Sequence, residues 1–150
     1  MHNNVVIKEF APENVSVMQF NDKDEYENIM KTCPYYFDLL PQMCEGNVFS
    51  VYKNNQIIYI FGWIPSFQNF CQITFFASEN LHKEFDKNVL TSVKTIFNKI
   101  KSSWERIETT CKENKKNKRF LEFFGFKQEC LMKKYGFNGE DMYLYAYVRK

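Results

Sequence analysis

One stretch constrains the fold of this chain more than any other: an Asn, a short helical run and a Gly-Phe pair. Asn114 lies eleven residues before Gly125, and Phe126 follows directly. A strand-like segment over 106–111 precedes this stretch, and a strand, a turn and a second strand over 130–150 follow it. Because glycine readily adopts the left-handed conformation that ends many helices, Gly125 is a suitable end for the short helix. The C-terminal third is therefore expected to run strand, short helix, strand, strand.

A long amphipathic helix is predicted before this stretch. From Glu79 to Trp104, apolar residues recur at spacings of three and four, which is the period of one helix face. Ser78 is the expected N-cap, because its hydroxyl can accept a hydrogen bond from an amide of the first turn. The helix lies between strand-like runs over 72–77 and 107–111, so the sequence predicts one parallel, right-handed crossover.

The rest of the chain predicts short strands and helices around one sheet. Asn54 and Asn55 separate two strand-like runs, and Asn tolerates the positive φ of a tight hairpin turn. Pro34 is expected to end a short helix, and Pro41 to follow a further helical turn. Residues 1–150 are therefore expected to form a single α+β domain with a mixed, mostly antiparallel sheet, a central strand–long helix–strand crossover and a C-terminal hairpin. The predicted strands lie over 5–10, 48–52, 56–63, 72–77, 107–111, 132–135 and 142–148, and the short helices over 25–31, 35–40 and 119–124.

Size and composition fit one globular domain. The chain has 150 residues, and its 45% hydrophobic and 18% aromatic content supports a packed core rather than disorder. The 20 basic and 18 acidic residues leave a net charge of +2, so composition gives no general case for nucleic acid or membrane as a partner. No apolar run approaches the ~20 residues of a membrane helix, and the N-terminus carries no apolar secretory segment. We therefore expect a cytoplasmic protein.

The cysteines and histidines give no sign of a metal site or of a disulfide framework. The five cysteines are widely spaced, and no two form a Cys-x-x-Cys pair. Reduced, buried thiols are the simpler interpretation. His2 and His82 are the only histidines, which leaves little for a His-based metal site or a catalytic triad. We expect no metal.

The order of elements around Asn114 resembles the C-terminal half of the GNAT acetyltransferase fold. By element order the resemblance covers most of the chain, and by residues it covers about 72–150. It implies acetyl-CoA as the cofactor, held where the fourth and fifth strands diverge. Backbone groups at the end of the fourth strand would bond the pantetheine arm, and amides at the start of the long helix would bind the diphosphate. The cofactor-binding residues that the resemblance implies are Phe75, Phe76, Ala77, Ser78 and Asn114.

Two catalytic features of that family are missing from this sequence. The family holds the diphosphate in a glycine-rich loop, because glycine lets backbone amides come close to phosphate oxygens. Residues 78–85 contain no glycine, and Glu79 and Glu84 add negative charge there. The family also often places a Tyr seven residues after the Asn, as the general acid for the leaving thiolate. This sequence has Leu121 at that position, which donates no proton.

Other residues are candidates for acid–base chemistry. Tyr135, Tyr143 and Tyr145 lie nearby in the sequence and could replace the missing Tyr, although strand packing explains each of them more simply. Glu108 on the fifth strand is the best acidic candidate for a base, with an ordinary surface carboxylate as the alternative. The sequence therefore assigns no catalytic residue.

A closer likeness involves the run from Phe75 to Glu79 and the run from Arg119 to Gly125. Together with Asn114 they resemble the GNAT-like internal virion protein A family of short-tailed phages, which also tends to carry Arg-Phe-Leu where the enzymes carry Phe-Tyr. The resemblance implies a GNAT scaffold that acts in a phage particle or in its assembly. Its partners would be other virion proteins, and it would be found in the cytoplasm of the host cell or in the virion.

Three functions are compatible with these observations. The first is a virion or assembly protein without a cofactor, which the missing glycines and Leu121 favour. The alternative is an active N-acetyltransferase that uses acetyl-CoA and an unknown amine. The third is a nucleic-acid-associated module that uses a basic run, which could equally contact phosphates of CoA or form a solvated helix face. The basic run consists of Lys112, Lys115, Lys116, Lys118 and Arg119.

Overall fold

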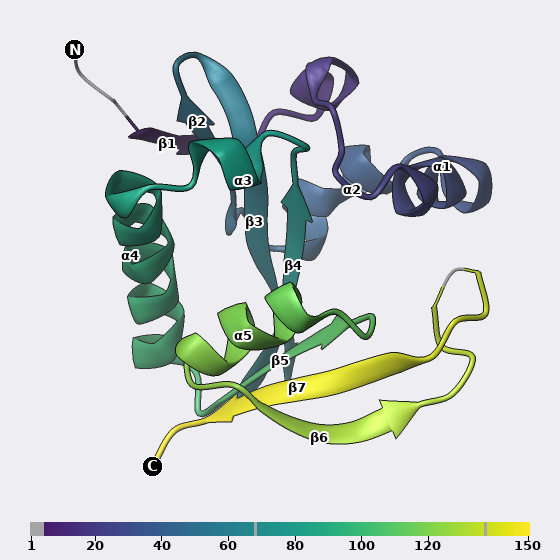
Figure 1. Ribbon diagram of the computed structural model, residues 1–150, viewed down its shortest axis with the longest axis vertical. Helices are drawn as coiled ribbons and strands as arrows, with labels where there is room; N and C mark the ends of the chain where they lie inside the picture. Colours follow the sequence, from purple (N-terminus) through teal and green to yellow (C-terminus); the bar gives the residue numbers. More distant parts are fainter. Residues whose placement is uncertain (1–4, 68, 137) are drawn as a thin grey trace.

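The computed structural model describes residues 5–67, 69–136 and 138–150. These residues form one sheet of seven strands with helices on both faces (Figure 1), which confirms the predicted α+β fold. The strand order is β1-β2-β3-β4-β5-β7-β6. In chain order the elements are β1 (Val5–Glu9), the 3-10 helix η1 (Pro12–Val17), α1 (Lys23–Thr32), α2 (Tyr36–Met43), β2 (Val48–Lys53), β3 (Gln56–Phe67), β4 (Phe70–Ala77), α3 (Leu81–Glu84), α4 (Lys87–Ser103), β5 (Arg106–Cys111), α5 (Lys115–Phe123), β6 (Lys127–Met132) and β7 (Met142–Val148).

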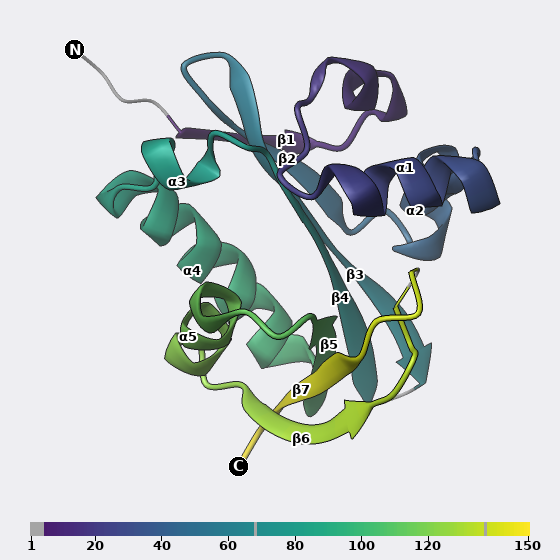
Figure 2. The same cartoon turned by 45° about the vertical axis from the view of Figure 1, so that its right-hand side comes forward.

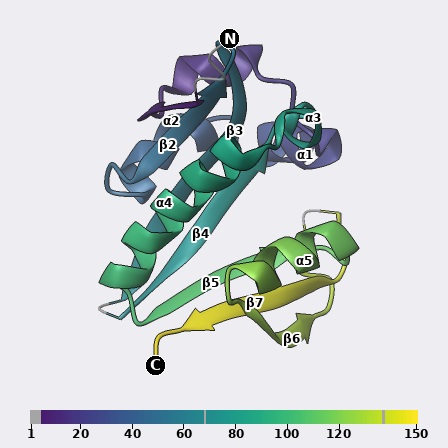
Figure 3. The same cartoon turned by 60° about the vertical axis from the view of Figure 1, so that its left-hand side comes forward.

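The sheet is antiparallel except where β4 meets β5, and these two strands run parallel. The chain crosses from β4 to β5 through α3 and α4, as the sequence predicts. The parallel pairing is short: 70–72 pairs with 106–108, and the described residues contain no further pair between these strands. Beyond this point β4 and β5 diverge, as Figure 3 shows. The crossover therefore opens a gap in the sheet.

Helices cover both faces of the sheet and create two cores (Figure 2). In the first core, Phe97 of α4 stacks on Phe124 with ring centroids 4.4 Å apart and meets Phe61 of β3 edge-on at 5.2 Å. In the second core, Phe37 of α2 lies 5.2 Å from Phe76 of β4. These aromatic side chains pack the interior, as their spacing predicts. None of the described helices is long and apolar enough to cross a membrane.

The long helix begins later than predicted. The N-cap of α4 is Asp86, whose carboxylate accepts hydrogen bonds from the amides of Asn88 and Val89, both at 3.0 Å. The Ser78 hydroxyl instead accepts from the Asn80 amide at 3.2 Å, in a turn that precedes the separate helix α3. A carboxylate both accepts amide hydrogen bonds and complements the positive end of the helix dipole, so it is the stronger cap here.

Several further boundaries also differ from prediction, and three of them have a local cause. Helix α2 continues through Pro41 rather than ending before it, because in a short helix one proline removes only one intrahelical hydrogen bond. Helix α5 starts earlier than predicted, because the Asn114 side chain accepts from two amides of its first turn. Strand β6 ends at Met132, where the prediction had a strand begin, because Lys134 lies in a turn with φ of 56°.

The predicted turn residues are confirmed. Asn54 and Asn55 have φ of 52° and 63° between β2 and β3, which are the positive values of a tight hairpin turn. Gly125 has φ of 90° at the end of α5, a conformation that glycine adopts without strain. A Cβ atom at Gly125 would also lie 3.3 Å from the Tyr147 ring. This glycine therefore fixes where α5 stops and β6 starts.

Candidate functional site at the divergence of two strands

The gap between β4 and β5 exposes a short length of β4 backbone. The Ser78 amide donates to the Ile58 carbonyl of β3 at 2.9 Å, so even-numbered residues of β4 turn their backbone groups to β3 and odd-numbered residues turn theirs to β5. On the β5 side, the Ala77 carbonyl accepts from the Asn21 amide at 2.9 Å. Phe75 lies past the last β5 partner and before this contact. Its amide and carbonyl therefore face the gap.

The structure places the other residues that were predicted to bind a cofactor differently. Phe76 turns its backbone to β3 and buries its ring in the second core. Ser78 is buried and bonds within its own turn. Asn114 is exposed, and its side-chain oxygen caps α5 through the amides of Lys116 and Asn117. Ala77, like Phe75, turns its backbone away from β3, but its carbonyl already accepts from the Asn21 amide. Phe75 is therefore the one of these residues whose amide and carbonyl both face the gap, and cofactor contact by any of them stays a prediction.

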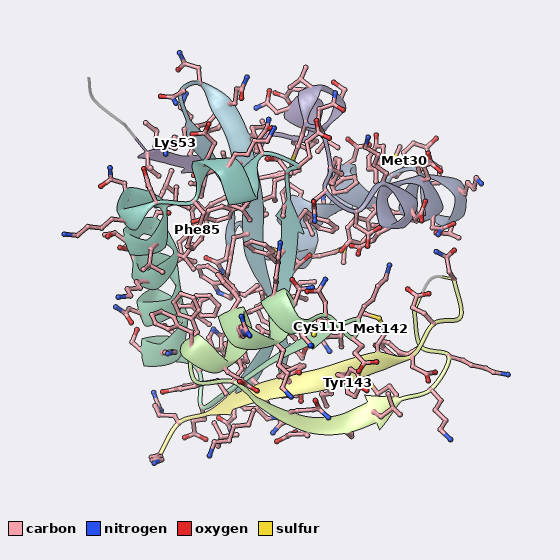
Figure 4. All side chains as sticks on the ribbon, viewed as in Figure 1. Met30, Lys53, Phe85, Cys111, Met142 and Tyr143 are labelled. Carbon is pink, nitrogen blue, oxygen red and sulfur yellow. The ribbon has the colours of Figure 1, made fainter. Side chains whose placement is uncertain are left out.

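An aromatic wall lines the gap on the side of α4 and α5. The Phe75 ring stacks on Tyr59 at 5.3 Å and lies 6.0 Å from the ring of Phe120 on α5. Phe85, between α3 and α4, is 39% exposed (Figure 4). Apolar rings beside unpaired backbone groups suit an extended ligand that is mostly apolar and carries amide groups.

The amides in the first turn of α4 are already bonded by a carboxylate of the protein itself. One oxygen of Asp86 accepts from the two amides of this turn, and the other accepts from the Lys53 ammonium at 2.7 Å. Lys53 also donates to the Glu84 carbonyl at 3.0 Å, and its side chain is only 6% exposed (labelled in Figure 4). The hydrogen bond from Lys53, more than those from the amides, lowers the pKa of Asp86. Both oxygens of this carboxylate are therefore engaged, and it stays ionised at neutral pH.

A second lysine bridges the wide end of the gap. Lys112, which follows β5, donates to Asp22 at 2.9 Å and lies 3.6 Å from Glu140 in the β6–β7 connection. Asp22 directly follows Asn21, whose amide donates to the end of β4. The Asp22 carboxylate caps α1 by accepting from the Glu25 amide at 2.9 Å. Lys112 therefore joins three segments that are far apart in the sequence. Within the predicted basic run, Lys112 is the lysine with two carboxylate partners, whereas Lys118 has one, Glu122, at 4.0 Å.

Glu25 is the carboxyl group of this cluster whose pKa is raised. Burial is the main cause and repulsion by Asp22 adds to it, whereas Lys112 acts in the opposite direction and Glu140 raises the pKa further. Burial would also raise the pKa of Asp22, but hydrogen bonds from the Glu25 amide and from Lys112 outweigh burial and lower it. Neighbouring carboxyl groups with pKa values shifted in opposite directions are typical of sites that transfer protons.

Sequence reasoning missed Glu25. The local signal was a helix cap, since Asp22 precedes Glu25 by three residues at the start of α1. Such a pattern indicates where a helix begins, and it carries no information about residues from other segments. The approach of Lys112 and Glu140 depends on the folded sheet.

Two positions that the sequence singled out, Glu108 and Leu121, do not supply an acid or a base. Glu108 accepts from the Arg106 guanidinium at 2.7 Å, and Arg106 also bonds Glu129. Leu121, where the fold's enzymes often carry a Tyr, is only 9% exposed and belongs to the first core. Glu108 is therefore held in an ion pair, and Leu121 is a packing residue.

The tyrosines that the sequence singled out occupy three different environments. Tyr145 is buried and donates to Gln128 at 3.2 Å, and Tyr135 is 61% exposed after β6. Tyr143 pairs with Cys111, the last residue of β5, and Figure 4 shows both beneath one end of α5. Burial raises the pKa of Cys111 to about 11, so this thiol is protonated at neutral pH. Of the three tyrosines, Tyr143 is the one opposite the last residue of β5, on the side of β5 that faces away from β4.

Solved structures match the fold over nearly the whole chain, whereas no family model and no curated protein matches the sequence. An acetyltransferase from Streptococcus agalactiae superposes with a TM-score of 0.69 at 16% identity, covering 98% of this chain and 99% of that one. Ard1 from Thermoplasma volcanium superposes with a TM-score of 0.67 at 12% identity, covering 97% and 98%. A GNAT family acetyltransferase from Elizabethkingia anophelis, with acetyl-CoA bound, superposes with a TM-score of 0.61 at 15% identity, covering 98% and 99%. At these identities the matches establish a GNAT fold and leave the activity open.

Proposed function

We propose that the protein transfers an acyl group from a pantetheine thioester to an amine. The gap between β4 and β5 carries this proposal, because the Phe75 amide and carbonyl face it without a neighbouring strand. A pantetheine arm contains two amide groups and can bond such an edge as an added strand would. Acetyltransferases with the same fold, one of them with acetyl-CoA bound, support this assignment.

Acetyl-CoA as a whole fits these residues only in part. Its pantetheine arm fits the Phe75 edge and the aromatic wall beside it. Its diphosphate would be expected at the first turn of the long helix, where Asp86 already accepts from both amides. The Glu84 carboxylate, 3.3 Å from Lys53, adds a second negative charge nearby. The residues therefore suit a thioester arm and do not suit a diphosphate.

The cluster around Lys112 is the proposed acceptor side. The Lys112 ammonium pairs with the carboxylates of Asp22 and Glu140 and also interacts electrostatically with that of Glu25, and this excess of negative charge attracts a cationic amine. An ammonium group must lose a proton before its nitrogen can attack a thioester. Glu25 is suited to accept that proton because its pKa is raised toward neutral pH. Tyr143, on β7 opposite the last residue of β5, is the hydroxyl that we assign to return a proton to the departing sulfur.

The test is amine-dependent release of thiol from S-acetylpantetheine, with a polyamine or a short peptide as the acceptor. Phe75→Pro removes the amide that faces the gap and leaves the hydrogen bonds to β3 intact. Phe75→Leu also loses the ring but keeps the amide, so it is the matched control. Release that is lost in Phe75→Pro and kept in Phe75→Leu supports the proposal. Equal release by the two variants, or none by the wild type with either acceptor, contradicts it.

A second candidate is a noncatalytic phage protein that acts in the virion or its assembly through protein contacts. Two observations favour it: Asp86 closes the first turn of α4, and Leu121 is a core residue. This function requires neither a thioester nor the carboxyl group of Glu25. Stable co-purification with a virion component, unchanged in Phe75→Pro and Glu25→Gln, would support it, whereas thiol release that depends on both residues would exclude it.

A further inference from the structure

We propose that the acyl donor is a small acidic carrier protein with a phosphopantetheine arm on a serine, rather than free CoA. This inference rests on the proposed acyl transfer and names its donor. The carrier protein would dock on the exposed basic surface that α5 shares with α4, and its arm would enter the gap beside Phe75. We call this surface the basic face. It consists of Lys87, Lys94, Lys115, Lys116, Lys118 and Arg119.

The state of the α4 N-terminus distinguishes the two donors. Free CoA carries a diphosphate and a ribose phosphate, whereas a carrier-bound arm carries a single phosphodiester. To bind a diphosphate at α4, the protein would have to displace Asp86 from two amides and from Lys53, which is nearly buried. An arm on a carrier protein needs none of these contacts, because protein–protein contacts supply the affinity. The structure thus leaves a binding site for the arm, whereas Asp86 blocks the site that a diphosphate would occupy.

The basic face has a large excess of positive charge. Helix α4 contains no Asp or Glu, and its exposed residues include Lys87 and Lys94. On α5, Lys115, Lys116, Lys118 and Arg119 are all exposed, and the one ion pair within this helix joins Lys118 to Glu122 at 4.0 Å.

Two details indicate that this charge is placed for an anionic partner. Lys115 and Lys116 lie in the first turn of α5, where the helix dipole disfavours cations. The Lys94 ammonium lies 5.6 Å from the centre of the Phe123 ring at the end of α5, so α4 and α5 are in contact there. The Phe123 side chain is 62% exposed within this surface. An exposed aromatic ring with a lysine beside it fits an acidic protein surface that also offers an apolar contact.

The position of the basic face relative to the gap favours a carrier protein over nucleic acid. Helix α5 directly follows the splayed end of β5, and its Phe120 contacts Phe75. A partner bound on α5 is therefore beside the entrance to the gap on the α4–α5 side. A carrier protein would use both the charges and the gap, whereas a nucleic acid would use the charges alone.

The experiment compares three ligands by calorimetric titration: a bacterial acyl carrier protein with its phosphopantetheine arm, the same carrier without the arm, and CoA. We expect the carrier with its arm to bind about tenfold or more tightly than the carrier without it, and CoA not to bind at about millimolar concentration. The double variant Lys116→Glu, Arg119→Glu should weaken carrier binding at least about tenfold. The control, Lys127→Glu with Lys133→Glu, makes the same charge change at exposed positions in and after β6 and should leave binding unchanged.

The possible failures are distinguishable. CoA binding at about micromolar concentration, with the carrier no tighter, overturns the carrier inference and leaves the proposed acyl transfer standing. Equal binding of the carrier with and without its arm, or equal effects of the two double variants, also overturns the inference. Salt-sensitive binding of a short DNA duplex that displaces the carrier, with no release of thiol, assigns the basic face to nucleic acid instead. Failure of S-acetylpantetheine to release thiol would contradict the proposed function itself.

Discussion

The molecule contains two lysine–carboxylate clusters, one at the start of α4 and one at the wide end of the gap, and they differ in which groups they leave free to react. Lys53 is 6% exposed, and its main partner Asp86 uses one oxygen for this lysine and the other for two amides of α4. Lys112 is 36% exposed, and more carboxylates surround it than one ammonium can neutralise. The first cluster fixes the start of a helix. The second contains a half-buried carboxyl group, that of Glu25, whose pKa is raised, and such a group is suited to proton transfer.

The largest expected effect is on the rate of acyl transfer, and it comes from the Lys112 cluster rather than from the Lys53 cluster. Glu25→Gln removes the proposed proton acceptor with little change in shape, and we expect about 100-fold slower acyl transfer at saturating amine. Glu27→Gln changes an exposed carboxylate on the same helix and should leave the rate unchanged. Steady-state thiol release measures both. An unchanged rate in Glu25→Gln would remove this residue from the proposed reaction.

A second prediction concerns the donor side. Asp86→Gly frees the α4 amides, and we expect CoA binding to become detectable, with at least about tenfold gain in affinity. Asp86→Asn keeps a cap and loses only the charge, so its gain should be smaller. Glu113→Gln, at an exposed position, is the charge control. If wild-type protein and both Asp86 variants bind CoA equally well, then Asp86 does not block diphosphate binding. Melting curves check that each variant is folded.

A third prediction uses the pH dependence of stability. The hydrogen bond from Lys53 lowers the pKa of Asp86 below its ordinary value of 3.8, so the carboxylate stabilises the folded state above that pH. This contribution is lost as the pH falls through the folded pKa, because the folded protein then has to take up the proton. Asp86→Asn should therefore melt at lower temperature than wild type at neutral pH, and the difference should shrink in acid. A difference in melting temperature that stays constant down to about pH 2 would contradict this reading.

The smallest expected effect tests the coupling between Lys112 and Glu25. Lys112 opposes the upward shift in the pKa of Glu25, so Lys112→Met should raise that pKa further. The base acts when it is deprotonated, so the rate should rise with pH through this pKa and the rise should move to higher pH in the variant. A pH–rate profile of kcat/KM measures the shift. The acid limb of Lys115→Met, in the basic face, should coincide with that of the wild type.

The sequence predicts the fold well because local patterns determine most of it. Asn54 and Asn55 have to take positive φ in their turn, and Gly125 ends α5 for the same conformational reason. The cap of α4 could not be chosen from the sequence, because both Ser78 and Asp86 can cap a helix. Lys53 decides between them, since it reaches Asp86 from β2. Helix-capping propensity alone therefore cannot predict which of the two residues caps α4.

The candidate site was only partly predictable for a related reason. The gap follows from the predicted crossover, and Phe75 is one of the residues that the resemblance to the GNAT fold indicated. Glu25 was missed because its partners come from the end of β5 and from the β6–β7 connection. Each segment looks like an ordinary cap or turn by itself. The perturbed pKa arises only when the sheet brings them together.

The most direct test of the central claim is a backbone amide NMR titration with S-acetylpantetheine. The amide of Phe75 faces the gap, whereas the amide of Phe76 turns to β3, so neighbouring residues serve as probe and control. We expect a large, saturable shift of the Phe75 amide and a much smaller shift of the Phe76 amide. Saturable shifts elsewhere with Phe75 unchanged, or no shift at any concentration, would contradict the claim that the gap between β4 and β5 binds the thioester arm.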